Sequence, residues 1–63
     1  MVEVSVEGKV FKFDTPISVG KILKKLGFLP MEVLVIDNDK LLTRDVVLRE
    51  DKKITIKVVY SKG

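Results

Sequence analysis

The 63-residue sequence contains no cysteine, no histidine and no tryptophan. Without cysteine, the chain can form no disulfide, no thiolate nucleophile and no zinc–cysteine site. Without histidine, it lacks the usual general base and the commonest metal ligand near neutral pH. The serine and threonine hydroxyls therefore have no histidine to activate them, and we predict that the chain has no catalytic residue, no metal site and no enzyme activity of its own.

Long apolar runs are also absent. The longest is Val-Leu-Val-Ile at residues 33–36, which is far too short to span a bilayer. The first residues, Met1-Val2-Glu3, do not resemble the start of a signal peptide. These features predict a soluble, cytoplasmic protein with no membrane partner.

Charge of one sign is not concentrated anywhere. Twelve basic and nine acidic residues are interleaved, and no basic block exceeds two residues. A nucleic-acid-binding surface usually needs a denser basic stripe and aromatic side chains for stacking. We therefore do not expect a nucleic-acid partner. The lysines Lys21, Lys24 and Lys25 indicate a solvated face more than a phosphate site.

The N-terminal residues show strand periodicity. Residues 2–6 alternate between valine and polar residues, which predicts a strand with three valines turned inward. Glu7-Gly8 provides a turn, because glycine tolerates positive φ. Residues 9–14 are predicted to return as a second strand, with Phe11 and Phe13 on one face.

Residues 18–26 carry a helical pattern. Ser18 occupies an N-cap position, and the apolar positions that follow have the i, i+3, i+4, i+7 spacing of one helix face. Gly27 suits the left-handed conformation that ends many helices. Gly20 weakens the first turn by about 1 kcal/mol relative to alanine, which suggests that some other group approaches closely there.

The rest of the chain is predicted to be mostly extended. Residues 28–30 form an apolar loop over the core, 32–37 and 41–42 form strands, and Asn38-Asp39 forms a turn, not a cation-binding loop. Residues 43–53 are irregular, with one tight turn at 46–48. The last strand is 54–60, with Ile54, Ile56, Val58 and Tyr60 on one side. Because an apolar strand at a sheet edge invites association, we place it inside the sheet.

This order of elements predicts an α+β protein with one helix packed on one face of a sheet. It resembles the β-grasp, or ubiquitin-like, fold: a single domain over residues 1–63, a mixed sheet of four to five strands, the last strand parallel to the first, and a short tail at 61–63. The predicted core consists of Val2, Val4, Val6, Phe11, Phe13, Val19, Ile22, Leu23, Leu26, Ile54, Ile56 and Val58.

Three segments and the tail narrow the resemblance. They are Ile17-Ser18-Val19 leading into the helix, Val35-Ile36-Asp37-Asn38-Asp39, and the approach from Leu48 to the last strand. Together they resemble the sulfur-carrier proteins ThiS and MoaD of thiamine and molybdopterin synthesis. The resemblance implies that the Gly63 carboxylate is adenylated by an enzyme that consumes ATP, becomes a thiocarboxylate, and delivers sulfur to a synthase in cofactor biosynthesis or tRNA thiolation. No cofactor is expected to bind. The family usually ends in Gly-Gly, whereas this chain ends Ser61-Lys62-Gly63.

Two alternatives stay open at this point. One is a ubiquitin-like modifier that is conjugated through Gly63, and the other is a noncatalytic β-grasp interaction module. For any of the three, the sheet face away from the helix is the predicted partner surface. It should carry Val10, Val59 and either Val33 with Val35 or Leu34 with Ile36, ringed by Lys12 and Lys57 and close to Tyr60. The free protein is expected to be a monomer.

Overall fold

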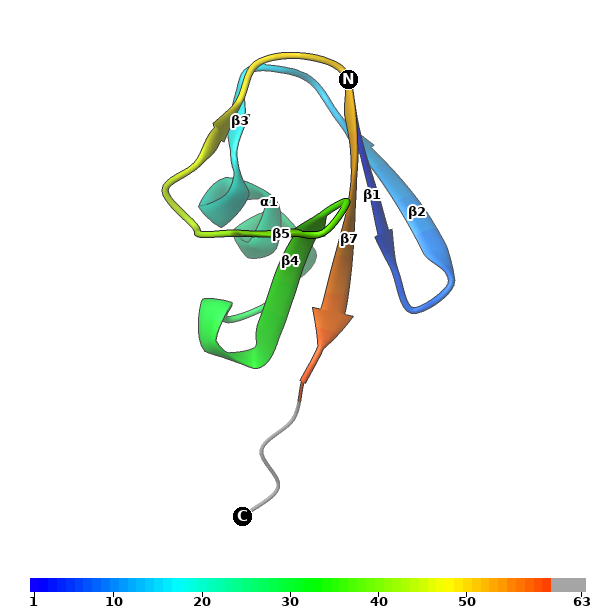
Figure 1. Cartoon of the computed structure of the whole chain (residues 1–63), viewed down its shortest axis with the longest axis vertical. Helices are drawn as coiled ribbons and strands as arrows, with labels where there is room; N and C mark the ends of the chain where they lie inside the picture. Colours follow the sequence, from blue (N-terminus) through cyan, green and yellow to red (C-terminus); the bar gives the residue numbers. More distant parts are fainter. Residues whose placement is uncertain (60–63) are drawn as a thin grey trace.

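The structure is a computed structural model, and it describes residues 1–59. Its elements, in chain order, are β1 (Val2–Val6), β2 (Lys9–Phe13), β3 (Ile17–Ser18), α1 (Val19–Leu26), the 3₁₀ turn η1 (Pro30–Glu32), β4 (Val33–Asp37), β5 (Lys40–Leu42), β6 (Val47–Leu48) and β7 (Lys52–Val58). Five strands form the main sheet, and α1 lies behind it in the view of Figure 1. The predicted α+β architecture is therefore confirmed.

The main sheet has the strand order β2-β1-β7-β4-β5. β7 lies in the middle, parallel to β1 on one side and antiparallel to β4 on the other. This confirms the predicted internal position of the last strand and its parallel pairing with the first. β7 begins at Lys52, two residues before the predicted start, and Tyr60 lies outside the described residues.

The helix begins and ends as its sequence predicts. The Ser18 hydroxyl oxygen accepts a hydrogen bond from the Lys21 backbone N–H at 3.1 Å, which satisfies one of the free amides of the first turn. At the other end, Gly27 has a φ of 85°, in the left-handed region where glycine carries no Cβ penalty. The backbone N–H of Phe28 then bonds to the Leu23 carbonyl, which closes the C-terminal turn.

The prediction for residues 43–53 is wrong in one respect. Residues 46–48 do not form a single tight turn: Val47 and Leu48 form β6, which pairs antiparallel with β3 in a second, two-stranded sheet. The backbone N–H groups of Val19 and Gly20 donate to the carbonyls of Val46 and Arg44 at 2.9 and 2.8 Å. The long crossing thus satisfies donors at the helix N-terminus that have no partner within the helix.

The loop after the helix also differs from the prediction. Phe28 is half-buried against the core, but Leu29 and Pro30 are exposed, so the loop does not pack over the core as a whole. Proline at the first position favours a helical turn, and residues 30–32 form η1. No helix within residues 1–59 is long and apolar enough to cross a membrane.

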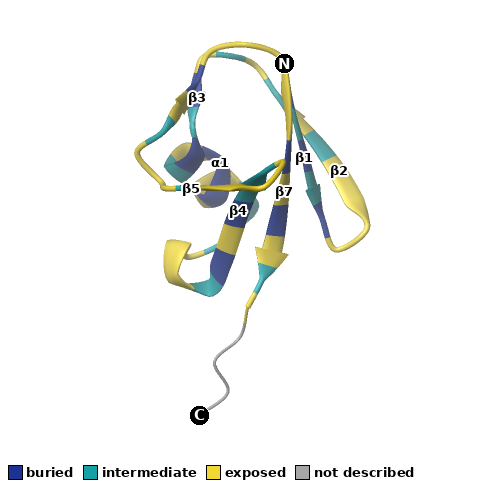
Figure 2. Ribbon diagram, viewed as in Figure 1, coloured by how far each residue is buried: buried dark blue, intermediate teal, exposed yellow. Residues whose placement is uncertain are grey.

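The core lies between α1 and the sheet, and buried and exposed residues alternate along β4 and β7 (Figure 2). Eight of the predicted core residues are buried, and the other four are half-buried and pack against the core: Phe11, Phe13, Leu26 and Val58. Four buried residues are absent from the predicted core: Ile17, Val33, Val35 and Leu48. All four belong to strands whose pairing could not be assigned from the sequence.

Candidate functional site

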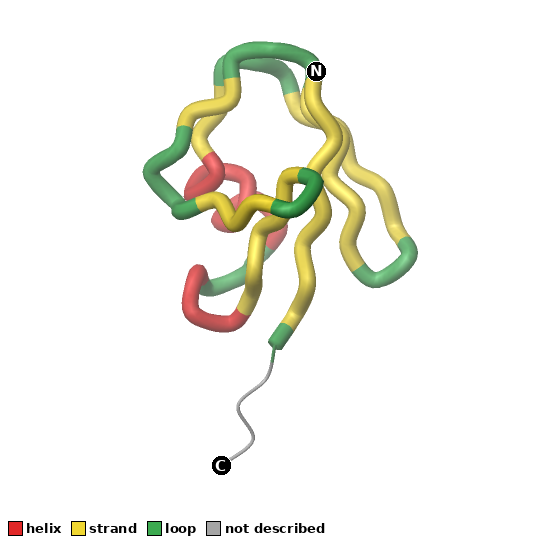
Figure 3. The backbone as a smooth tube through the Cα atoms, viewed as in Figure 1, coloured by secondary structure: helices red, strands yellow, loops and turns green. Residues whose placement is uncertain are grey.

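The first part of the candidate site is the end of the sheet at which β7 ends, here called the β7 exit. β7 ends at Val58, and the backbone N–H of Val59 donates to the Glu32 carbonyl at 2.8 Å. The ladder between β4 and β7 therefore holds the chain as far as Val59. η1 lies on one side of this exit and the turn between β1 and β2 on the other (Figure 3). The predicted tail residues Ser61, Lys62 and Gly63, together with Tyr60, lie outside the described residues.

η1 adds an apolar projection to this exit that sequence reasoning missed. The Glu32 carboxylate accepts the Leu29 N–H at 3.3 Å, and the Glu32 N–H donates to the Leu29 carbonyl at 2.9 Å. This tight turn leaves Met31 85% exposed. The only sequence signal was Pro30 at a helix-starting position, followed by an apolar residue with no partner in the strand pattern.

The sheet face turned away from α1, here called the outer face, is the second part of the site. Register fixes a row across all five strands: Leu41 is paired with Ile36, Ile36 with Thr55, Thr55 with Ser5, and Ser5 with Val10. This row carries no charge. On β4, the sequence left open whether Val33 and Val35 or Leu34 and Ile36 face outward. Leu34 and Ile36 point outward, whereas Val33 and Val35 are buried.

The predicted partner residues divide between the two halves of the outer face. Lys57 pairs with Leu34, and Val59 continues the alternation of β7 next to them, with 43% of its surface exposed. Val10 and Lys12 lie on β2, which is three strands from β4, or about 14 Å away at the usual strand spacing. The structure therefore brings Leu34, Lys57 and Val59 together and leaves Val10 and Lys12 at the far edge.

Leu41 is a further apolar residue of the outer face that the sequence analysis omitted. It is 65% exposed on β5, directly beside Ile36. We define the apolar patch as Leu34, Ile36, Leu41 and Val59. A sheet with one face packed on a helix and the other exposed usually carries polar residues outside, so apolar residues gathered there mark a candidate contact surface.

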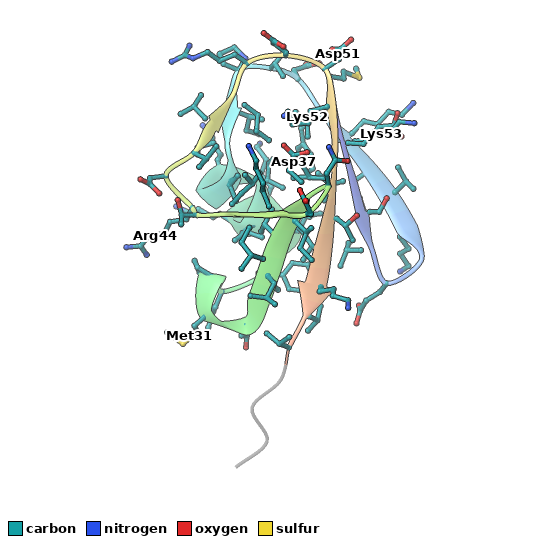
Figure 4. All side chains as sticks on the ribbon, viewed as in Figure 1. Met31, Asp37, Arg44, Asp51, Lys52 and Lys53 are labelled. Carbon is teal, nitrogen blue, oxygen red and sulfur yellow. The ribbon has the colours of Figure 1, made fainter. Side chains whose placement is uncertain are left out.

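The ion pairs of the described residues lie at the opposite end of β7 (Figure 4). Lys52 Nζ donates to Asp37 Oδ2 at 2.7 Å, and this hydrogen bond raises the pKa of Lys52. The amino group of Met1 pairs with Asp51 and lowers the pKa of that carboxyl. Residues 1–59 contain no cluster of three or more side chains suited to hold a metal ion. The β7 exit therefore lies at the other end of the strand from these ion pairs, whereas Ile36 and Leu41 of the apolar patch directly adjoin Asp37 and Lys40.

No known family model matches the sequence, and no curated protein does. A solved structure does match: the thiamine biosynthesis protein ThiS from Geobacter metallireducens, with a TM-score of 0.61 over 97% of both chains and 18% sequence identity. The chain has the ThiS fold. At this identity the likeness lies in the backbone: one helix on a mixed sheet with the last strand at its centre. The predicted β-grasp architecture is confirmed by this match.

Proposed function

We propose that this protein is a sulfur carrier whose Gly63 carboxylate is activated and loaded by partner enzymes. One observation carries the proposal: the central strand β7 pairs with β1 as far as Ile56 and with β4 as far as Val58, and the Val59 N–H still bonds to the Glu32 carbonyl. The chain is thus held beside the apolar patch up to four residues before Gly63. The fold shared with ThiS, a thiamine biosynthesis protein, supports the same role. A rigid strand before a short reactive segment is suited to presenting that segment to an enzyme.

The proposed chemistry follows from the poor reactivity of a carboxylate. An oxygen of the Gly63 carboxylate attacks the α-phosphorus of ATP in the partner enzyme, pyrophosphate leaves, and the carboxyl becomes a mixed anhydride with AMP. A sulfide donor then attacks the carbonyl carbon and AMP leaves, which gives the thiocarboxylate. Glycine suits this position because, without a Cβ, its backbone can approach the reacting groups closely. The carrier then delivers sulfur to a synthase in cofactor biosynthesis or tRNA thiolation.

The outer face is the proposed docking surface for the adenylating enzyme. The apolar patch would provide buried contact area, and Lys57 beside it favours an acidic group on the enzyme. Tyr60 follows directly after Val59 in the sequence. Val10 and Lys12 would contact the enzyme only if its footprint extended across Ser5 and Thr55 to β2.

The docking surface can be tested with Val59→Asp. We expect this variant to keep its fold, because Val59 is exposed, and to lose at least about tenfold in affinity for the adenylating enzyme, because a charge would enter an apolar contact. The matched control is Val47→Asp, since Val47 is 45% exposed and lies on β6, away from the β7 exit. Affinity is measured by titration calorimetry and activation by ATP–pyrophosphate exchange. Equal affinity of the two variants would contradict the docking surface.

The carrier chemistry is tested separately by the intact mass of the protein purified from its native cell. We expect a species in which sulfur replaces one oxygen and which returns to the unmodified mass after hydrolysis. Higher-mass species joined to other proteins by amide bonds would instead indicate a ubiquitin-like modifier. If only the unmodified mass is found while the adenylating enzyme is present, the protein is a noncatalytic interaction module.

A further inference from the structure

β2 forms the edge of the main sheet opposite β5, and within residues 1–59 no strand pairs with its second side. Glu7 and Gly8 have φ values of 50° and 80°, which is the primed two-residue turn of a β-hairpin. Val6 and Lys9 are thus a hydrogen-bonded pair, and the alternation along the hairpin turns the backbone N–H and C=O groups of Val10 and Lys12 away from β1.

A groove lies between this edge and the helix. Its volume is about 400 Å³, and the apolar side chains of Phe13, Pro16 and Ile17 form part of its lining. Phe13 is half-buried and Ile17 is buried in the core, so this part of the groove is fixed by packing. A strand that paired with β2 would therefore find side-chain contacts already in place on the helix side.

The charges around the groove are mostly positive. Lys21 and Lys25 lie on successive turns of one helix face, and Lys12 comes from β2. Asp14 is the acidic side chain in the lining. Three cations therefore surround the groove against one carboxylate, and Lys9 adds a further exposed cation to the same strand.

We infer that this groove binds an acidic, extended segment of a partner protein, which adds to the free edge of β2 as a further strand. The outward backbone groups of Val10 and Lys12 supply hydrogen bonds, and the lysines supply charge complementarity. A second copy of this chain is disfavoured, because pairing two β2 strands would bring their lysines together. The inference does not rest on the carrier role, because the groove lies on the helix side of the edge and the apolar patch on the other face of the sheet, and only Lys12, at the edge itself, could serve both.

The test uses a fluorescent peptide of about eight residues in which valine alternates with aspartate or glutamate, a length typical of strands. A matched peptide carries N-methyl groups on alternate amides, which keeps its charge and side chains but removes the donors needed to pair with β2. We expect the first peptide to bind and the methylated peptide to bind at least about tenfold more weakly, since several backbone hydrogen bonds are lost. Amide chemical-shift changes should centre on residues 10–14 and not on the opposite edge strand β5.

Charge-reversal variants of α1 provide a second test of peptide binding. Lys21→Glu combined with Lys25→Glu should weaken peptide binding by about tenfold or more, because both reversals place like charges beside the peptide. Lys24→Glu is the control: it changes the same charge on the same helix at an exposed position outside the groove. We expect a loss of affinity of about twofold or less, because the Lys24 side chain does not line the groove.

Several results would overturn the inference. Equal binding of the methylated peptide would show charge attraction without strand pairing. A loss for Lys24→Glu that reaches half that of the double reversal on a logarithmic scale of affinity would show that net charge alone matters and that no specific groove is used, because the control changes the charge half as much. A concentration-dependent dimer that competes with the peptide would assign the edge to a second copy of the chain. A single-stranded oligonucleotide that binds the same lysines more tightly than the peptide would assign the groove to nucleic acid.

Discussion

At the scale of single residues, Gly20 shows why a residue of poor helix propensity stands in the first turn of α1. An alanine Cβ at this position would lie 3.1 Å from the Arg44 carbonyl oxygen, which also accepts the Gly20 N–H. The sequence predicted a close approach near Gly20, because glycine is a poor choice within a first helical turn. The approaching group could not be predicted, since Arg44 belongs to an irregular crossing with no pattern of its own.

Gly20→Ala is expected to destabilise the protein despite the higher helix propensity of alanine. Propensity alone favours alanine by about 1 kcal/mol, but the Arg44 backbone would have to move while Val46 holds the crossing to Val19. Lys24→Gly, at an exposed position of the same helix, measures how much glycine costs through helix propensity alone. Urea unfolding measures both. A gain in stability for Gly20→Ala would show that the crossing is free to shift.

Thr43 supports a pH-dependent prediction at the same scale. Its hydroxyl donates to Asp45 Oδ1 at 2.5 Å, and this hydrogen bond is the main reason that the pKa of Asp45 lies below 3.8. A lowered carboxyl pKa stabilises the fold above the ordinary value, and this contribution is lost as the pH falls through the folded pKa. Thr43→Val should therefore raise the Asp45 pKa in an NMR titration, and the part of its stability difference from the parent that depends on pH should vanish in acid. The Asp51 pKa, which the Met1 amino group lowers, should not move.

At the scale of elements, local patterns predicted those parts whose pairing partners are near in sequence. The hairpin of β1 and β2 and the capped helix α1 follow from alternation, turn residues and capping groups within a few positions of one another. β3 and β6 could not be predicted, because each is two residues long and they pair across about thirty positions. Strands that short carry no periodicity, and tertiary pairing alone defines them.

Leu23→Ala tests the packing of the helix on the sheet. Leu23 is 2% exposed, so truncating it should leave a cavity and lower the free energy of unfolding by about 2–5 kcal/mol. Leu41→Ala is the matched control on the outer face, where we expect a change of about 0.5 kcal/mol or less. Chemical denaturation of both variants gives the comparison. Equal losses would mean that the outer face is as packed as the core.

At the scale of the whole molecule, the sequence predicted the central strand and one face for partners, but not the full composition of that face. β7 was placed inside the sheet because of its apolar pattern, and the pairing of β7 with β1 and β4 agrees. The sequence could not decide whether Val33 and Val35 or Leu34 and Ile36 face outward, because both faces of β4 are apolar. The strand register decides it. Leu41 could not be predicted to lie on the outer face, because β5 is too short for its inward and outward residues to be told apart from the sequence.

Gly63 is the residue proposed to be adenylated, and its deletion separates stability from activation. Deleting Gly63 should leave thermal stability unchanged, because the core residues of the structure lie between Val2 and Ile56. The same deletion should abolish ATP-dependent activation if the Gly63 carboxylate is the group that is adenylated. Pyrophosphate exchange and thermal unfolding, measured on one preparation, separate these two effects. Activation that survives the deletion would place the reactive group elsewhere.

Lys62→Gly restores the Gly-Gly ending typical of sulfur carriers without changing the core. We expect it to raise the rate of adenylation, because a residue with no side chain enters the active site of an adenylating enzyme more easily than lysine. If Lys62 instead pairs with an exposed acidic group of a dedicated enzyme, the substitution should weaken binding by about 0.2–1 kcal/mol. Both results agree with the carrier proposal and differ in what they say of the enzyme. If neither the parent nor Lys62→Gly forms an adenylate with its cognate enzyme, the carrier proposal is wrong and the protein acts by binding alone.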